Sequence, residues 1–125
     1  MHLIIGGAYQ GKLTFAKKLY NFKPEQIFYC EQSGEIDFSL PCITHIEEFV
    51  YGCVLRSEDA LAYWEKHRSQ WKDSILICRD ISCGVVPTSP QYRLWRDETG
   101  RLCQNLARDA NIVSRIFLGL EQRLK

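Results

Sequence analysis

The sequence lacks an excess of charge of either sign and lacks any long hydrophobic run. Its 125 residues carry 16 Lys and Arg against 15 Asp and Glu, a formal net charge of +1. A near-neutral chain has no electrostatic basis for binding nucleic acid or an anionic membrane as a whole. The first apolar run, 3–5, is too short for a signal-peptide core, and no run approaches the roughly 18 residues of a membrane span. We therefore expect no nucleic-acid partner and no membrane partner.

Metal-binding cysteine patterns are also missing, although the chain contains six cysteines. No two cysteines stand at C-x-x-C spacing, and no Cys or His pair has the spacing of a zinc finger. Without a secretory signal, this usage favours buried thiols in a reducing compartment over a disulfide framework. We expect no metal bound by these residues, and a cytoplasmic location.

What is present is the composition of an ordinary globular domain, with 46% hydrophobic and 25% charged residues. The length predicts a single domain over residues 1–125. Apolar runs predict strands, and periodic segments predict helices. The predicted strands are 2–5, 27–30, 41–44, 74–78 and 111–118, with a short terminal strand at 120–125 left open, and the predicted helices are 13–20, 46–55, 57–71 and 91–110. This alternation predicts a three-layer α/β domain with a mostly parallel sheet of about five strands.

Details of these helices make further predictions. On the first helix, we expect Leu13, Ala16, Leu19 and Tyr20 to share the buried face. On the third, Ser57 is the predicted N-cap. Gly52 should weaken the helix at 46–55. On the last, Leu94 is predicted to be one of the apolar contacts.

The strongest motif lies between the first strand and the first helix, where Gly6-x-x-x-x-Gly11-Lys12 matches the core of a P-loop. Glycines let backbone N–H groups curl around a phosphate without a Cβ in the way, and the following helix adds its positive end. A lysine at this position reaches the β- and γ-phosphates. The predicted nucleotide-binding residues are Gly6, Gly7, Ala8, Tyr9, Gln10, Gly11, Lys12, Leu13 and Thr14. The pattern indicates the phosphates of a nucleotide as the ligand and does not identify the base.

One position departs from the motif, because Leu13 stands where a Ser or Thr hydroxyl normally ligates Mg²⁺. Thr14 is one residue late, about 100° around the helix. Two interpretations stay open: Mg²⁺ is bound through water and an acidic residue elsewhere, or the site binds nucleotide without turnover. Asp80, directly after the predicted strand 74–78, is the candidate for the acidic residue, and a turn or cap carboxylate is the alternative. The predicted catalytic residues are therefore Lys12 and Asp80.

Other side chains are weaker candidates. His45 could be a nucleophile, a base or a capping residue, and His67 is best explained by packing. The tryptophans are best explained as core residues, and the arginines of the last helix either reach phosphates or form a solvated face. These side chains are Trp64, Trp71, Trp95, Arg93, Arg96 and Arg101.

Two blocks of sequence resemble the adenosylcobinamide kinase/adenosylcobinamide-phosphate guanylyltransferase family. Residues 3–12 are similar to its opening strand and Gly-Gly-Ala-Arg-Ser-Gly-Lys-Ser. Residues 84–87, Gly-Val-Val-Pro, resemble its Gly-Ile-Val-Pro, and Arg79-Asp80 stands where that family has Asn-Glu. The segment from Arg96 to Ala107 is similar to its Arg-Asp-x-x-Gly-x-x-Asn-Gln-x-x-Ala, with Cys103 in place of the Asn. Residues 110–125 are similar to its closing Ala-Asp-x-Val strand, Ser-Gly turn and final Lys.

This resemblance implies a P-loop fold, often assembled as oligomers, and phosphorylation of the aminopropanol hydroxyl of adenosylcobinamide by ATP or GTP. It also implies a guanylyl transfer through a covalent guanylyl-histidine. The chain is much shorter than that family's members, and the His-x-x-x-Arg-x-x-x-Trp segment that carries the guanylylated histidine has no clear counterpart. We therefore expect a kinase of cobalamin biosynthesis or salvage with a nucleotide and a corrinoid as partners. The alternative is a non-catalytic nucleotide-binding relative with a regulatory or assembly role. A homo-oligomer is left open.

Overall fold

A six-stranded sheet in the order β2-β3-β4-β1-β5-β6 forms the centre of the protein. The computed structural model describes residues 1–82 and 89–125. The strands are β1 (His2–Gly6), β2 (Ile27–Tyr29), β3 (Cys42–Thr44), β4 (Ile75–Arg79), β5 (Ile112–Phe117) and β6 (Leu120–Arg123). All neighbouring pairs are parallel except β5 and β6, which form an antiparallel hairpin at one edge. The terminal strand is therefore formed, and the mostly parallel sheet is confirmed.

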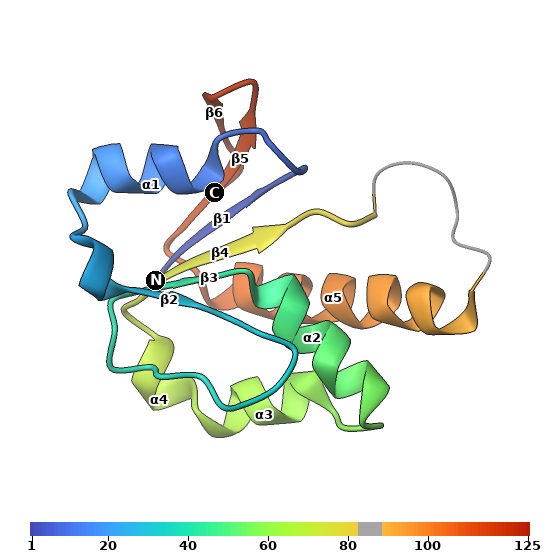
Figure 1. The fold of residues 1–125 in the computed structure, drawn as a ribbon. Helices are drawn as coiled ribbons and strands as arrows, with labels where there is room; N and C mark the ends of the chain where they lie inside the picture. Colours follow the sequence, from blue (N-terminus) through green and yellow to red (C-terminus); the bar gives the residue numbers. More distant parts are fainter. Residues whose placement is uncertain (83–88) are drawn as a thin grey trace.

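Helices cover both faces of this sheet, as Figure 1 shows. The helix α1 (Lys12–Tyr20) lies on one face, followed by a short 3₁₀ turn at Pro24–Gln26. The opposite face carries α2 (Ile46–Leu55), α3 (Ala60–Lys66), α4 (Arg68–Trp71) and α5 (Pro90–Asp109). The result is the predicted three-layer α/β architecture of a P-loop NTPase-like domain.

The side chains of β4 contribute alternately to the two hydrophobic clusters on opposite faces of the sheet. Ile75 and Ile77 pack into the apolar cluster beneath α1, whereas Leu76 and Cys78 pack into the larger cluster beneath α2, α3 and α5. Successive side chains of a strand point to opposite faces, so a strand covered on both faces needs a continuous apolar run. The run at 74–78 is therefore explained, and its four buried strand residues confirm the prediction.

The predicted helix at 57–71 is wrong as a single element. Ser57 lies outside any helix with a φ of 55°, and the chain makes two short helices that break at His67. Asp59 is the N-cap of α3, where its Oδ1 accepts a hydrogen bond from the Ala62 amide at 3.2 Å. Trp64 and Trp71 are buried as expected, and the Trp71 indole N–H donates to the Trp64 carbonyl across the break at 2.7 Å.

Two smaller predictions are also wrong. Leu19 is 54% exposed and Leu94 is 47% exposed, so neither contributes to the core. Of the face predicted for α1, Ala16 is fully buried, while Tyr20 lies at the margin, where its hydroxyl pairs with the His2 imidazole. Leu13 and Phe15 pack against the same cluster as Ala16, so the buried face of α1 lies nearer its start than predicted.

Gly52 supports α2 instead of weakening it. A Cβ at this position would lie 1.8 Å from the Gln32 carbonyl oxygen, so the helix and the segment after β2 touch backbone to backbone. The helix runs over its predicted range, 46–55, because close packing outweighs the helix propensity lost at glycine.

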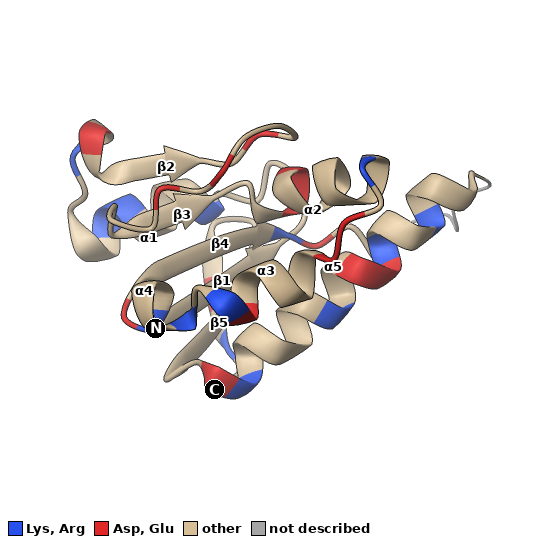
Figure 2. Ribbon diagram, turned by 90° about the horizontal axis from the view of Figure 1, so that it is seen from below, with Lys and Arg blue, Asp and Glu red and all other residues tan. Residues whose placement is uncertain are grey.

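Charged residues of both signs lie on the surface of the molecule (Figure 2). Basic and acidic segments are interspersed along α5 in Figure 2. Within residues 1–82 and 89–125, no helix combines the length and apolar character that crossing a membrane requires.

Cys30, Cys42, Cys53 and Cys78 are buried free thiols, and burial raises the pKa of Cys42 to about 12. Cys83 lies outside the described residues.

Candidate functional site

The glycine-rich segment forms the connection between β1 and α1 at the carboxyl end of the parallel strands. Gly11 caps α1 with a φ of 90°, a left-handed conformation that favours glycine, and Tyr9 has a φ of 61° at the loop tip. The cap supplies no side-chain acceptor, and the first turn of α1 contains no acidic residue. The positive end of the helix is therefore not neutralised by its own residues, which is the local electrostatics of an anion site.

Gly6 is required by packing against a neighbouring strand. A Cβ at Gly6 would lie 2.5 Å from the Ile116 carbonyl oxygen of β5, whereas a Cβ at Gly7 would make only ordinary contacts. The amide of Asp80 donates to the Gly6 carbonyl at 2.8 Å, which extends the β1–β4 ladder into the loop. Glycine at position 6 is therefore required by the close packing of β1 between β4 and β5, whether or not the loop binds a phosphate.

Gln10 ties the loop to the hairpin between β5 and β6. Its side-chain Oε1 accepts a hydrogen bond from the Leu118 amide at 2.7 Å, and its carbonyl accepts one from the Gly119 amide at 2.9 Å. Its carboxamide oxygen therefore contributes to the shape of the loop.

Lys12 lies under the loop, half-buried. Its Nζ donates a hydrogen bond to the Gly7 carbonyl at 2.7 Å. Burial lowers the pKa of the Lys12 ammonium below its usual value; the nearby Glu47 carboxylate opposes this shift, and Arg79 adds to it. The Gly7 carbonyl thus holds the ammonium in place, and the Glu47 carboxylate compensates only part of its positive charge. The remaining charge is available to a phosphate.

A cavity of about 390 Å³ opens beside this loop. Its lining combines residues of the predicted loop with residues from the ends of β3 and β4 and the start of α2. They are Ala8, Tyr9, Gly11, Lys12, Leu13, Thr14, Thr44, His45, Glu47, Glu48, Ile77 and Arg79. Gly6, Gly7 and Gln10 are outside the lining. The structure therefore brings six of the nine predicted binding residues to one cavity.

Glu47 is a buried carboxylate of this cavity, and the sequence analysis did not predict it as a site residue. Only 4% of its surface is exposed, and its Oε1 accepts a hydrogen bond from the Arg79 amide at 2.7 Å. Its own carbonyl accepts a hydrogen bond from the Trp95 indole N–H at 2.7 Å. The available signal was its position: it follows β3, whose carboxyl end lies at the same sheet edge as that of β1.

Arg79, the last residue of β4, brings a second cation to the cavity. Its guanidinium carbon lies 5.7 Å from the centre of the Trp95 ring, a cation–π distance. Trp95 is half-buried at the margin of the core, so it combines packing with a contact to the site.

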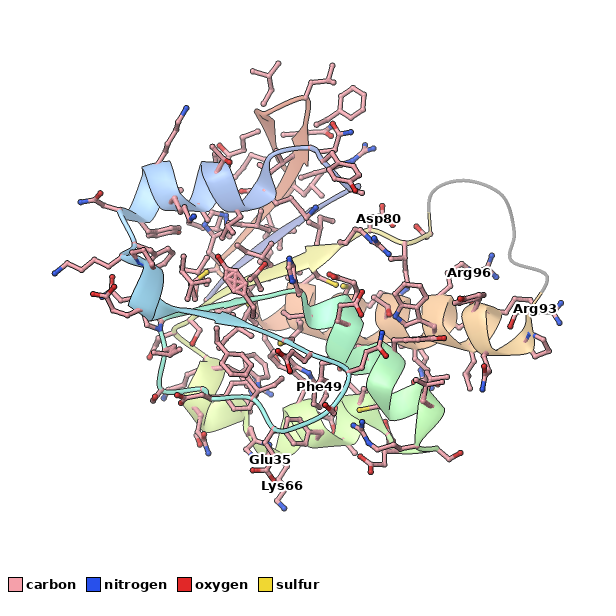
Figure 3. The ribbon with its side chains drawn as sticks, viewed as in Figure 1. Glu35, Phe49, Lys66, Asp80, Arg93 and Arg96 are labelled. Carbon is pink, nitrogen blue, oxygen red and sulfur yellow. The ribbon has the colours of Figure 1, made fainter. Side chains whose placement is uncertain are left out.

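Asp80 lies in an adjoining cavity of about 170 Å³ lined also by Arg79, Arg96 and Thr99. Its Oδ1 accepts hydrogen bonds from the Ser82 amide at 2.9 Å and the Ser82 hydroxyl at 2.5 Å. Figure 3 shows Asp80 at the end of β4, with Arg96 on α5 and Arg93 nearer the beginning of that helix. Its catalytic role stays a prediction, and its place in the neighbouring cavity puts it on the side away from Lys12.

The residues around the loop do not fit the usual P-loop magnesium site. Leu13 packs against the apolar cluster beneath α1, and its side chain has no hydroxyl to offer a metal ion. Among residues 1–82 and 89–125, no three His, Cys, Asp or Glu side chains are grouped as a metal site. The Glu47 carboxylate already accepts the Arg79 amide. We therefore derive no chemical step through Mg²⁺.

The two histidines considered above have different surroundings. His45 lines the cavity, is exposed and caps α2 with a φ of 59°, and its ring lies edge-on to Tyr29. His67 stacks on Phe38, and its Nδ1 lies 2.8 Å from the Tyr63 carbonyl. Packing therefore accounts for His67, whereas His45 is within the candidate site.

Comparison with known proteins identifies a family. The sequence model described as cobinamide kinase / cobinamide phosphate guanyltransferase matches residues 53–124, more than half of the chain. The matched segment contains Arg79, Asp80 and α5, and the loop at 6–14 precedes it. Residues 84–87, which carry part of the resemblance, lie outside the described residues. No curated protein matches the chain.

Proposed function

Because the chain belongs to the cobinamide kinase / cobinamide phosphate guanyltransferase family, we propose that residues 6–14 bind the triphosphate of ATP or GTP, from which the γ-phosphoryl group is transferred to adenosylcobinamide. The observation that carries this proposal is the Lys12 ammonium, held at 2.7 Å from the Gly7 carbonyl beside a cavity and a helix N-terminus that has no side-chain cap. Membership of the family supports a transferase role in cobalamin biosynthesis.

In the proposed reaction, the aminopropanol hydroxyl of the corrinoid attacks the γ-phosphorus. The new O–P bond forms as the bond to the β,γ-bridging oxygen breaks, the nucleoside diphosphate leaves, and the hydroxyl proton passes to a base or solvent. Lys12 and the α1 amides stabilise the charge on the transferring group. Asp80 stays the proposed acidic residue of the site, and it lines the adjoining cavity with Arg79 and Arg96.

Leu13 favours a second candidate function, a relative that binds nucleotide without transferring it. A P-loop without its hydroxyl ligand retains the backbone amides and the lysine that hold the phosphates. The guanylyl-transfer step is outside our proposal, because the histidine segment that carries it in the family has no counterpart here.

The proposal is tested by incubating the protein with ATP or GTP and cobinamide, and detecting cobinamide phosphate by mass spectrometry. We expect product from the wild type and about a hundredfold less from Lys12→Ala. Lys18→Ala, an exposed lysine of α1 outside the cavity, is the matched control and should retain full activity. No cobinamide phosphate with either nucleotide would refute the kinase proposal.

Leu13→Ser separates the two candidate functions. A gain of magnesium-dependent turnover would identify a kinase site that has lost its metal ligand. Unchanged binding with no gain of turnover would favour the binding role.

A further inference from the structure

We propose that Arg79 is the second phosphate-binding cation of the loop cavity, so that triphosphate binding does not depend on a divalent cation. This inference rests on the proposed function, since it assigns a role within the same site. In P-loop proteins Lys and Mg²⁺ together neutralise the β- and γ-phosphates. Here the hydroxyl that ligates the metal is replaced by Leu13, and Arg79 lines the same cavity as Lys12.

The backbone places Arg79 opposite the start of the loop. In the parallel pairing of β1 with β4, Arg79 is in register with Gly6, the first glycine of the motif. The Arg79 amide donates to Glu47, and the next amide, that of Asp80, donates to Gly6. These contacts fix the backbone at Arg79 and Asp80, and the Arg79 guanidinium makes the separate contact with Trp95.

The alternation along β4 directs this side chain toward the loop. Ile75 and Ile77 face the cluster beneath α1, and strand alternation places the Arg79 Cβ on that same face, while the guanidinium reaches Trp95 of α5. Ile77 and Arg79 both line the cavity that Lys12 lines. The guanidinium lies 5.7 Å from the centre of the Trp95 ring. To bind a phosphate in the cavity, it would exchange this cation–π contact for hydrogen bonds to the anion.

Electrostatics supports the same role. Lys12 and Arg79 interact unfavourably, as Arg79 contributes to lowering the lysine pKa. The two carboxylates of the cavity have partners, because Glu47 accepts the Arg79 amide and Glu48 accepts the Gln32 carboxamide at 3.0 Å. A polyphosphate bound between the two cations would relieve their repulsion and would accept the bidentate hydrogen bonds that guanidinium offers.

The first test is the metal dependence of the wild-type protein. Isothermal titration calorimetry with ATP, GTP and inorganic tripolyphosphate is done in EDTA and in excess Mg²⁺. We expect the affinity for each nucleotide to change by less than about threefold between the two conditions, since Arg79 supplies the second charge. A loss of about thirtyfold or more in EDTA would overturn the inference. This measurement needs no variant.

The second test replaces the guanidinium. Arg79→Gln should lose about tenfold or more in affinity for ATP and tripolyphosphate in EDTA, with a smaller loss for AMP. Arg79→Lys should retain an intermediate affinity. Arg101→Gln, an exposed arginine of α5 that pairs with Glu98, is the matched control and should bind as the wild type does. Thermal melts of each variant check that it is folded.

These outcomes separate the inference from the proposed function. Loss of binding in Lys12→Ala with unchanged binding in Arg79→Gln would overturn the inference and leave the proposed function standing. Absence of binding in the wild type under both conditions would refute the proposed function, and the inference with it.

Discussion

Glu47 places a negative charge where the account requires an anion to bind. Its carboxylate is buried, faces the Lys12 ammonium through space and accepts the Arg79 amide. A carboxylate at this point repels phosphate, and it also keeps Lys12 protonated by raising the lysine pKa against the effect of burial.

Glu47→Gln keeps an oxygen acceptor for the Arg79 amide and removes the charge. We expect tripolyphosphate to bind about three- to tenfold more tightly at neutral pH, because less repulsion opposes the anion. Calorimetry measures the effect. Glu48→Gln, whose carboxylate is partly exposed and already paired with Gln32, is the control and should change the affinity less. Weaker binding in Glu47→Gln would contradict this electrostatic description of the cavity.

At the scale of single residues, the sequence identifies what a local motif defines. Lys12 and Gly11 were predicted because their spacing along the chain is the motif itself. Glu47 and Arg79 were missed as site residues because they reach the loop only through strand pairing and the alternation of β4. Such relations depend on register between distant segments, which no local spacing records.

Among the elements, α2 depends on one backbone contact. Gly52→Ala would place a methyl group 1.8 Å from the Gln32 carbonyl oxygen, so the helix or the segment after β2 must move. We expect a loss of about 3 kcal/mol in the free energy of unfolding, measured by urea denaturation.

Gly100 provides the matched control for that substitution. It lies within α5, and a Cβ there would meet no atom within 4 Å. Gly100→Ala should stabilise the protein by about 0.5–1 kcal/mol, because alanine is the better helix former. Equal effects of the two substitutions would show that the close approach at Gly52 is not important.

Helices were predicted correctly where apolar periodicity was the main signal. The prediction was wrong where capping residues interrupted that periodicity. The helix at 46–55 and most of α5 follow their apolar periodicity. The segment 57–71 has the same periodicity, yet it divides because Asp59 caps one helix and the chain turns again at His67. The hydrogen bond between Gln10 and Leu118 of the β5–β6 hairpin joins residues 108 positions apart. No local sequence pattern predicts such a contact.

For the molecule as a whole, His2 connects four elements on the α1 side of the sheet. Its Nδ1 lies 2.5 Å from the Tyr20 hydroxyl, its Nε2 lies 2.7 Å from the Ser114 hydroxyl, and that hydroxyl in turn donates to Glu121. Burial lowers the pKa of His2 below 6.5; Glu121 opposes the shift, and Arg123 and the N-terminal amine add to it.

This pKa predicts a loss of stability in mild acid. The folded protein binds the His2 proton less readily than the unfolded chain does, so the stabilisation is fully present above pH 6.5 and is lost as the pH falls through the folded-state pKa. We expect the free energy of unfolding to fall by up to about 1.4 kcal/mol per pH unit in that range. His2→Gln should flatten the profile, while His45→Gln, an exposed histidine, should not. An unchanged profile in His2→Gln would contradict this assignment.

The α/β class was predictable because it follows from the order of strand and helix patterns over the whole chain. Continuous apolar runs such as 74–78 indicate a parallel sheet covered on both faces, and the order of the two motif blocks pointed to the family. The strand order places β4 directly beside β1, and it is this pairing that brings Arg79 and Asp80 to the loop.

The central claim is that the loop at residues 6–14 binds a nucleoside triphosphate through Lys12. Calorimetric titration of the wild type and Lys12→Ala with ATP and with GTP tests it most directly. The account predicts micromolar binding of at least one of the two nucleotides by the wild type, and loss of that binding in a Lys12→Ala variant that melts as the wild type does. No heat of binding with either nucleotide, or equal affinity in the two proteins, would contradict it.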